Sequence, residues 1–433
     1  MPDVTLTPLT RPFDATFTPP GSKSLTNRAL VLAALSSGPS QLRNVLFADD
    51  TRVMLDSLAR LGFEPKVDEA TRTVAIQGRG GDVPNRSADC FIGNSGTTVR
   101  FLTALCTLGK GVYTLDGIER MRQRPIGPLV TMLRNLGARI SHPLDDGFPP
   151  VRVEADRLPG GRIYFGAESS SQYLSSVLQV APYTRHEVRV DLGPKQTSWP
   201  YVQMTMRLMD EFGHTPELER DPDTGEPIRI HVPQGAYAPT HYDVEPDASN
   251  ASYFLALAAI HPGSRVTLNG LGTHSLQGDV KFIDVLKRMG ASTEATTGFL
   301  RVTGPKQLNG IDVDLADMPD LAQTLGVVAL FADGPTTMRG LHTLRVKETD
   351  RIAALQNELA KLGAHVVVDG DASMTVTPPR SVSQASIHTY DDHRMAMSFA
   401  LAGTRASGVV IQDVQCVNKT YPEFFDDLSR VGG

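Results

Sequence analysis

Polar side chains and cations gather at the points where six apolar segments of the chain begin. These segments begin near residues 21, 93, 168, 247, 318 and 391. Each opening is rich in Ser, Thr, Asn or Asp, which cap helices, and each leads into a run of small apolar residues. A helix N-terminus offers free N–H groups and partial positive charge, so it binds anions. Capping alone accounts for one such start, but six starts with added cations predict a site for a small polyanion.

The candidate site residues at these starts are hydroxyls, amides, glycine and charged groups. They are Lys23, Ser24, Arg28, Asn94, Gly96, Thr97, Arg100, Ser170, Ser171, Gln172, Asp320 and the Asp391-Asp392-His393-Arg394 run. Two charged stretches fit the same site: MRQRPIGPL (121–129), which carries Arg122 and Arg124, and LRVKETDRI (344–352). Read alone, LRVKETDRI is equally well a solvated helix start with local ion pairs, and Lys419 is an ordinary surface lysine.

More familiar sites are excluded by the residues themselves. The GSKS sequence has Ser22 where a P-loop requires glycine before the lysine, and it lacks the upstream glycine. His393 has no second histidine or carboxylate at helical ligand spacing except the adjoining aspartates. The three cysteines lie far apart and form no Cys/His cluster, so each is expected to be a small buried residue. We expect neither a metal nor a cofactor.

An internal repeat supplies the elements that must position these groups. Five amphipathic helical segments end in a hydrophobic residue followed by glycine, and two short strands follow each segment. The glycines are Gly62, Gly137, Gly213, Gly290 and Gly363, at intervals of 73 to 77 residues. Glycine at this place suits the left-handed residue that follows a helix. The apolar helices should be buried, and the amphipathic helices should lie outside them.

The sixth copy of the repeat is divided between the two ends of the chain. FFDDLSRVGG supplies the last amphipathic helix with Gly432, but no strands follow it. VTLTPL (4–9) resembles the second strand of the preceding copy, MTVTPP (374–379). We therefore expect the N-terminal segment to pair within the C-terminal domain and to complete the last repeat.

Two linkers divide the six units into three and three. Pro19-Pro20 precedes the first unit, and APTH (238–241) precedes the fourth. The expected fold class is α/β (α+β), with an N-terminal domain at 21–240 and a C-terminal domain formed by 1–20 plus 241–433. A cleft between two such domains is expected to close on its ligand, as in hinge-bending enzymes.

Composition restricts the class of protein. The chain has 433 residues, 40% of them hydrophobic and 21% charged, with a formal net charge of −6. This charge gives no support to a role in coating nucleic acid, and no apolar run is long enough for a transmembrane helix. The N-terminus lacks the apolar region of a signal peptide. Few cysteines and the absence of a targeting segment favour a cytosolic enzyme.

The motifs together resemble the 5-enolpyruvylshikimate-3-phosphate synthase family. The resemblance runs from about residue 4 to the last helix, and it rests on PGSKSLTNRALVLAAL, GNSGTTVRFL, RMRQRPIGPL, SSQYL, EPDASNASYFLA, LRVKETDR, YDDHRMAM and NKTYPEFF. It implies two domains of three repeats with buried parallel helices, the inside-out barrel of enolpyruvyl transferases. It also implies a monomer without metal that transfers the enolpyruvyl group of phosphoenolpyruvate to shikimate 3-phosphate.

The resemblance assigns two sets of ligands by position. Shikimate 3-phosphate is expected to contact Lys23, Ser24, Arg28, Ser170, Ser171, Gln172, Ser198, Tyr201, Asp320 and Lys347. Phosphoenolpyruvate is expected to contact Lys23, Gly96, Arg124, Arg351, Arg394 and Lys419. Both substrates carry a carboxylate and a phosphate, which suit arginine forks and lysine ammonium groups.

Three residues are expected to act in catalysis. The reaction adds the acceptor hydroxyl to phosphoenolpyruvate and then eliminates phosphate through a tetrahedral intermediate. Asp320 is the expected base and Glu348 the expected acid, with Lys23 assisting charge transfer. Burial would raise the pKa of Glu348 from its reference of about 4.3, whereas neighbouring cations would lower it.

Departures and rivals remain at this point. Thr343 and Leu344 stand where many members of the family have Asn-Trp, so one acceptor contact is open. A sister family transfers enolpyruvyl to UDP-N-acetylglucosamine, but it uses Lys-Asn at the first helix and a loop cysteine. Here the pair is Lys23-Ser24, and the loop at 115–124 has no cysteine. A catalytically inactive repeat protein that binds a phosphorylated ligand is disfavoured by the presence of Asp320, Glu348 and Lys23.

Overall fold

The chain forms two compact units, each with its own core. The computed structural model describes residues 3–166, 170–194, 196 and 198–431. The N-terminal unit comprises 21–244, and the C-terminal unit comprises 1–20 together with 245–433. The boundary expected after residue 240 therefore lies four residues further on. The reason is that β14 (His241–Asp243) pairs in parallel with β3 (Pro39–Arg43), which ties this segment to the N-terminal unit.

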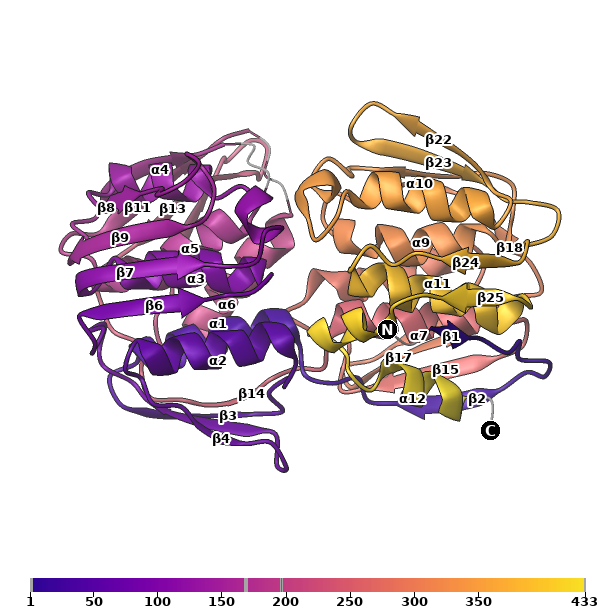
Figure 1. The fold of residues 1–433 in the computed structure, drawn as a ribbon, viewed down its shortest axis with the longest axis horizontal. Coiled ribbons are helices and arrows are strands. Elements are labelled where there is room, and N and C mark those ends of the chain that lie inside the picture. Colours follow the sequence, from indigo (N-terminus) through magenta and orange to yellow (C-terminus); the bar gives the residue numbers. More distant parts are fainter. Residues whose placement is uncertain (1–2, 167–169, 195, 197, 432–433) are drawn as a thin grey trace. The chain divides into compact units, whose positions relative to one another are not determined.

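Among its described residues, the N-terminal unit contains three four-stranded sheets and six α-helices (Figure 1). Its further strands are β4 (Lys66–Asp68), β5 (Thr73–Gln77), β6 (Ser87–Phe91), β7 (Lys110–Asp116), β8 (Arg139–Ser141), β9 (Val151–Asp156), β10 (Gly161–Phe165), β11 (Val188–Leu192), β12 (Glu217–Arg220) and β13 (Pro227–Val232). Its helices are α1 (Lys23–Leu35), α2 (Asp49–Arg60), α3 (Gly96–Cys106), α4 (Gly127–Asn135), α5 (Gln172–Val180) and α6 (Trp199–Glu211). The sheet orders are β14-β3-β5-β4, β6-β7-β9-β8 and β10-β11-β13-β12.

The C-terminal unit repeats this plan. Its strands are β1 (Val4–Thr5), β2 (Asp14–Phe17), β15 (Arg265–Asn269), β16 (Ser292–Ala295), β17 (Phe299–Thr303), β18 (Leu308–Asn309), β19 (Asp312–Asp314), β20 (Ala332–Asp333), β21 (Thr336–Arg339), β22 (His365–Asp369), β23 (Ser373–Thr377), β24 (Ala385–Ile387) and β25 (Val409–Ile411). Its helices are α7 (Ala248–Ile260), α8 (Phe282–Arg288), α9 (Ala322–Ala329), α10 (Arg351–Lys361), α11 (His393–Arg405) and α12 (Phe424–Arg430). In the described part of this unit, two four-stranded sheets, β16-β17-β15-β2 and β19-β21-β23-β22, accompany a three-stranded and a two-stranded sheet.

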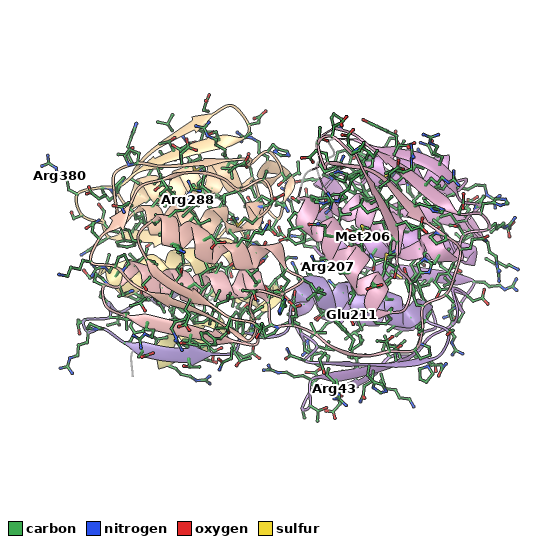
Figure 2. All side chains as sticks on the ribbon, turned by 180° about the vertical axis from the view of Figure 1, so that it is seen from behind. Arg43, Met206, Arg207, Glu211, Arg288 and Arg380 are labelled. Atoms are coloured by element: carbon green, nitrogen blue, oxygen red, sulfur yellow. The ribbon has the colours of Figure 1, made fainter. Side chains whose placement is uncertain are left out.

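The cap-rich apolar helices are buried, as their sequences predict. Every residue of α3 and α9 is buried, and so is every residue of α11 except the last. The amphipathic helices keep one exposed face. On α6, Figure 2 shows Met206, Arg207 and Glu211, of which Arg207 and Glu211 are exposed, whereas Leu208 and Met209 of the same helix are buried.

Side-chain contacts show that buried helices within a unit begin at the same level. In the C-terminal unit, the Thr324 hydroxyl of α9 lies 3.3 Å from Ser252 Oγ of α7 and 3.4 Å from Ser398 Oγ of α11. Ser252 and Ser398 stand in the second turn of their helices, and Thr324 is the third residue of α9. In the N-terminal unit, Gln172 Nε2 at the start of α5 donates to Thr97 Oγ1 at the start of α3, at 3.3 Å. Neighbouring helix N-termini therefore meet in each unit.

The five repeat glycines have the backbone conformation expected of them. Their φ angles are +93° at Gly62, +96° at Gly137, +79° at Gly213, +103° at Gly290 and +93° at Gly363. This left-handed region is costly for residues with a Cβ atom, so glycine ends each amphipathic helix. The sixth glycine of the series, Gly432, lies outside the described residues.

The N-terminal strand completes the last repeat. β1 pairs antiparallel with β25, with Val4 opposite Ile411 and Thr5 opposite Val410 (Figure 1). In the sheets of the other five repeats, this position is held by β5, β9, β13, β17 or β23, each antiparallel to the preceding strand of its own repeat. The start of the chain therefore pairs with β25, in the last repeat of the C-terminal unit.

Candidate active site

Three cations of the C-terminal unit converge on the carboxylate of Asp320. Asp320 lies in a short 3-10 turn, Pro319–Leu321, directly before α9. Its Oδ1 atom lies 2.9 Å from Arg351 Nη1 and 3.2 Å from Lys347 Nζ, and its Oδ2 atom lies 3.1 Å from Arg394 Nη2. These cations come from two other segments of the unit, 344–351 and the start of α11. One carboxylate therefore links three chain segments that are remote in sequence.

Arg351 is the centre of this network. Its side chain is 1% exposed, and besides Asp320 it contacts two more carboxylates. Nε lies 2.7 Å from Asp392 Oδ2, while Nη2 lies 3.0 Å from Glu348 Oε2 and 3.2 Å from Asp392 Oδ1. Lys419 Nζ lies 3.9 Å from the other oxygen of Glu348. Four cations and three carboxylates thus share one largely buried cluster, whose formal charge is positive.

Helix starts hold the network in place. Asp350 caps α10, accepting hydrogen bonds from the backbone N–H groups of Ile352 and Ala353 at 3.1 Å, so Arg351 is the first helical residue. Asp392 caps α11 in the same way, because its Oδ1 accepts from the Arg394 N–H at 2.9 Å. The two aspartate caps therefore fix the start of each helix, and with it the position from which the side chain of Arg351 or Arg394 projects.

Electrostatics keeps Asp320 ionised. Burial of this carboxyl raises its pKa, but Lys347, Arg394 and Arg351 outweigh burial and hold the pKa well below the usual range. Burial lowers the pKa of the Lys347 ammonium, although the Asp320 carboxylate opposes this. Asp320 can therefore accept a hydrogen bond or a proton only as a carboxylate already held by cations.

Arg28 is a fully buried cation of the N-terminal unit. Its Nε donates to Thr205 Oγ1 at 2.7 Å, and its Nη1 donates to the Ser24 carbonyl at 3.0 Å. Nη2 donates to the Tyr201 carbonyl at 3.3 Å, and the guanidinium lies over the Phe101 ring at 5.1 Å. Burial lowers the pKa of Arg28 to about 10, so it still carries its charge at neutral pH.

The starts of α3 and α5 form a second polar group in this unit. Arg100 Nη1 donates to Gln172 Oε1 at 2.7 Å and to Ser170 Oγ at 3.4 Å, and its guanidinium lies over the Tyr173 ring. Ser171 is buried beside them. The segment directly before, residues 167–169, lies outside the described residues, as does Thr197 before Ser198.

Arg124 and Lys23 lie beside helix starts of the same unit. Arg124 Nη1 donates to the Asn94 carbonyl at 2.9 Å, and its guanidinium passes close to Gly96, where a Cβ atom would lie 2.5 Å from Nη2. Lys23, the first residue of α1, has its Nζ 3.3 Å from Asp50 Oδ2 at the start of α2. Glycine at 96 thus leaves room for the arginine.

The structure brings many of the predicted residues into contact. The six residues of the C-terminal unit to which the resemblance assigns a role belong to one network: Asp320, Lys347, Glu348, Arg351, Arg394 and Lys419. In the N-terminal unit, Arg28 contacts the backbones of Ser24 and Tyr201, whereas Ser198 adopts a left-handed backbone conformation before α6. The sequence indicates Asp392 only as part of a helix start, and nothing in it indicates the ion pair with Arg351.

Three further observations concern features considered in the sequence. Thr343, at the position of the open acceptor contact, is buried, and its hydroxyl has no hydrogen-bond partner among the described residues. Within the same residues, no group of three His, Cys, Asp or Glu side chains is arranged to hold a metal ion. No described helix is long and apolar enough to cross a membrane.

Comparison with known proteins identifies the family of the chain. Residues 9–428 match the family model of EPSP synthase (3-phosphoshikimate 1-carboxyvinyltransferase). The chain is 42% identical over 434 residues to the 3-phosphoshikimate 1-carboxyvinyltransferase of Trichormus variabilis, with 100% of both chains covered. It is 45% identical over 427 residues to the chloroplastic protein of that name from Arabidopsis thaliana, covering 95% of this chain and 81% of the relative.

A solved structure of the same family has a similar fold. The solved EPSP synthase of Acinetobacter baumannii is similar with a TM-score of 0.80 at 25% identity, covering 99% of this chain and 98% of that one. This likeness confirms the expected fold class, a mixed helix and strand architecture with two domains.

Proposed function

Because the chain belongs to the EPSP synthase family, we propose that it is a 3-phosphoshikimate 1-carboxyvinyltransferase. It transfers the enolpyruvyl group of phosphoenolpyruvate to the 5-hydroxyl of shikimate 3-phosphate and releases phosphate. This reaction belongs to the shikimate pathway of aromatic amino-acid biosynthesis. The observation that carries the proposal is the Asp320–Arg351–Glu348 network, in which carboxylates suited to proton transfer lie among cations suited to anionic substrates.

Asp320 is proposed as the base that takes the proton of the acceptor hydroxyl. Its low pKa keeps it ionised, but the same three cations also reduce its basicity. Substrate phosphate and carboxylate groups that bind Lys347, Arg351 and Arg394 would offset this positive charge. The basicity of Asp320 would then rise at the moment when the acceptor hydroxyl is in place.

Glu348 is proposed as the acid that protonates the vinyl methylene of phosphoenolpyruvate. Its carboxyl is buried and lies between Arg351 and Lys419. A phosphoenolpyruvate anion that takes over these two cations would leave Glu348 buried with less positive charge around it. Such surroundings favour the protonated form that an acid needs. Lys23, 3.3 Å from Asp50, is proposed to compensate charge that develops on the transferring group.

The remaining candidates are proposed as binding groups. Arg124, Arg351, Arg394 and Lys419, with the backbone of Gly96, would hold phosphoenolpyruvate. Ser24, Arg28, Ser170, Ser171, Gln172, Ser198, Tyr201 and Lys347 would hold shikimate 3-phosphate. Two of these arginines, Arg28 and Arg351, are well suited to bind anions. Both are buried guanidinium groups with fixed partners, so they lose little conformational freedom on binding.

Release of phosphate from phosphoenolpyruvate tests the proposed activity. We expect rapid release with shikimate 3-phosphate as acceptor and none with UDP-N-acetylglucosamine. Release only with the nucleotide sugar would assign the chain to the sister activity. Release with neither acceptor, from protein whose thermal unfolding is cooperative, would instead indicate an inactive binding protein.

The location and the assembly of the protein are proposed as well. Cys90, Cys106 and Cys416 are all free and buried, which is typical of proteins in reducing compartments, so we propose a cytosolic location. We propose a monomer, which light scattering at micromolar concentration would test. A dimer mass in that experiment would reject it.

A further inference from the structure

The turn that leads into α11 has an unusual backbone. Tyr390 and Asp391 are consecutive non-glycine residues with φ angles of +55° and +52°. The left-handed region is sparsely populated by residues other than glycine, asparagine and aspartate, and such residues persist only where surrounding contacts compensate the cost. The turn of residues 388–392 ends at Asp392, which contacts Arg351. Contacts with neighbouring residues must therefore stabilise this turn.

Glu358 of α10 supplies those contacts. Its side chain is 0% exposed. Oε1 accepts a hydrogen bond from the Tyr390 hydroxyl at 2.7 Å, and Oε2 accepts from the His388 backbone N–H at 3.0 Å and from Lys361 Nζ at 2.6 Å. A buried carboxylate with this many donors makes strong, charge-assisted hydrogen bonds. Glu358 therefore fixes the first half of the turn.

Arg351 fixes the other half from the same helix. Glu358 stands seven residues after Arg351, so the two side chains project from one face of α10, two turns apart. Arg351 holds both oxygens of Asp392, at 2.7 and 3.2 Å, and Asp392 in turn accepts from the Arg394 N–H. Two residues of α10 thus bind the turn, one near each end. Arg394 lies two residues after Asp392, the last residue of the turn.

We propose that Glu358 and Tyr390 are positioning residues for phosphoenolpyruvate binding. By stabilising the turn 388–392, they keep Asp392 in contact with Arg351. They also fix the backbone position from which the Arg394 side chain projects. The proposal rests on the proposed function, because it takes Arg351 and Arg394 as ligands of phosphoenolpyruvate. Neither Glu358 nor Tyr390 is among the residues that would touch a substrate. Their effect should therefore appear in the affinity for one substrate only.

Steady-state kinetics of Tyr390→Phe and Glu358→Gln test this inference. Tyr390→Phe removes one hydroxyl, and Glu358→Gln keeps the shape of the side chain while removing its charge. We expect the KM for phosphoenolpyruvate to rise about 5- to 10-fold and that for shikimate 3-phosphate less than about 2-fold, the loss expected of one charge-assisted hydrogen bond. Tyr113→Phe is the matched control, because its hydroxyl donates to the Asn85 carbonyl in the N-terminal unit. It should leave both constants unchanged.

Hydrogen exchange of the backbone amides of residues 388–394 provides a readout besides activity. Exchange should be faster in both variants than in the unaltered protein and unchanged in Tyr113→Phe. Faster exchange without a change in the KM for phosphoenolpyruvate would overturn the inference, since the turn would then be loosened without moving the arginines. Equal increases in both KM values, or unchanged exchange and kinetics, would overturn it as well. A lack of phosphate release by the unaltered protein would instead reject the proposed function.

Discussion

Asp320 and Arg351 are joined by an ion pair of 2.9 Å, although one precedes α9 and the other begins α10. The proposed base is therefore held by a cation proposed to bind a substrate anion. Arg351 also keeps Asp392, at 2.7 Å, on its opposite side. A substrate anion can thus displace Asp320 from Arg351 while Asp392 continues to fix the guanidinium. If Arg351 binds a substrate anion as proposed, this arrangement would link substrate binding to the release of the proposed base.

Replacing Asp320 by asparagine should separate binding from chemistry. Asp320→Asn removes the negative charge that competes with substrate anions, so binding of both substrates should be retained. Loss of the base should lower kcat by at least about 10²-fold. Calorimetric titration with shikimate 3-phosphate and single-turnover kinetics would measure the two effects. Asp333→Asn, an exposed position of the same unit, serves as the control, and near-normal turnover in Asp320→Asn would remove this residue from the mechanism.

Gly96→Ala should act through Arg124. The new Cβ atom would lie 2.5 Å from Arg124 Nη2 and 2.9 Å from its Cζ, which forces the guanidinium to move. The backbone at this position is helical, so alanine itself causes little strain. We expect the KM for phosphoenolpyruvate to rise about 3- to 10-fold, equivalent to the displacement of one charged hydrogen-bond donor. Thermal unfolding should be nearly unchanged; a large drop in the midpoint with unaltered KM would contradict this explanation.

Asp279 should make stability fall with rising pH over a defined interval. Burial raises the pKa of this carboxyl to about 6, although Ser249 Oγ donates a hydrogen bond to it and Arg394 opposes the shift. Because the folded pKa exceeds the unfolded value, the folded protein binds the proton more tightly. The destabilisation is absent below about pH 4, develops as pH rises to about 6, and then remains at up to about 3 kcal/mol.

Asp279→Asn should remove this pH dependence. Urea unfolding measured from pH 4 to 7 should give a flatter profile for the variant, which should be the more stable protein at pH 6 and 7 but not at pH 4. Asp312→Asn is the control, because its pairing with Arg339 lowers the pKa of Asp312, and that contribution is lost only as pH falls below about 4. Parallel profiles for Asp279→Asn and the unaltered protein would show that Asp279 titrates normally.

Removal of residues 1–6 should weaken the C-terminal unit. This deletion takes away β1 and Leu6, whose N–H donates to the Val409 carbonyl and whose side chain packs on the core. Loss of two partly buried apolar side chains and the strand pairing should cost about 2 kcal/mol of unfolding free energy. A shorter deletion of residues 1–3 keeps the strand and should cost little. Equal stability of both truncated proteins would show that closure by β1 contributes nothing.

The sequence by itself determined the repeat architecture and most of the candidate residues. Periodicity, capping residues and glycine after each amphipathic helix are local signals, because they reflect the conformation of a few neighbouring residues. These signals were enough to predict the buried helices, the left-handed glycines and the pairing of VTLTPL (4–9) with the last repeat. Motifs identified the family and hence the list of charged residues.

Only the tertiary structure decided which charges pair. Asp320 and Arg394 lie 74 residues apart, and Arg351 and Asp392 lie 41 apart, so no periodic pattern relates them. Their contacts depend on the level at which α9, α10 and α11 begin, which is set by side-chain packing along the helices. The boundary at 244 likewise follows from the pairing of β14 with β3, a contact across 200 residues. Local sequence specifies elements, whereas long-range packing specifies the electrostatics of the candidate site.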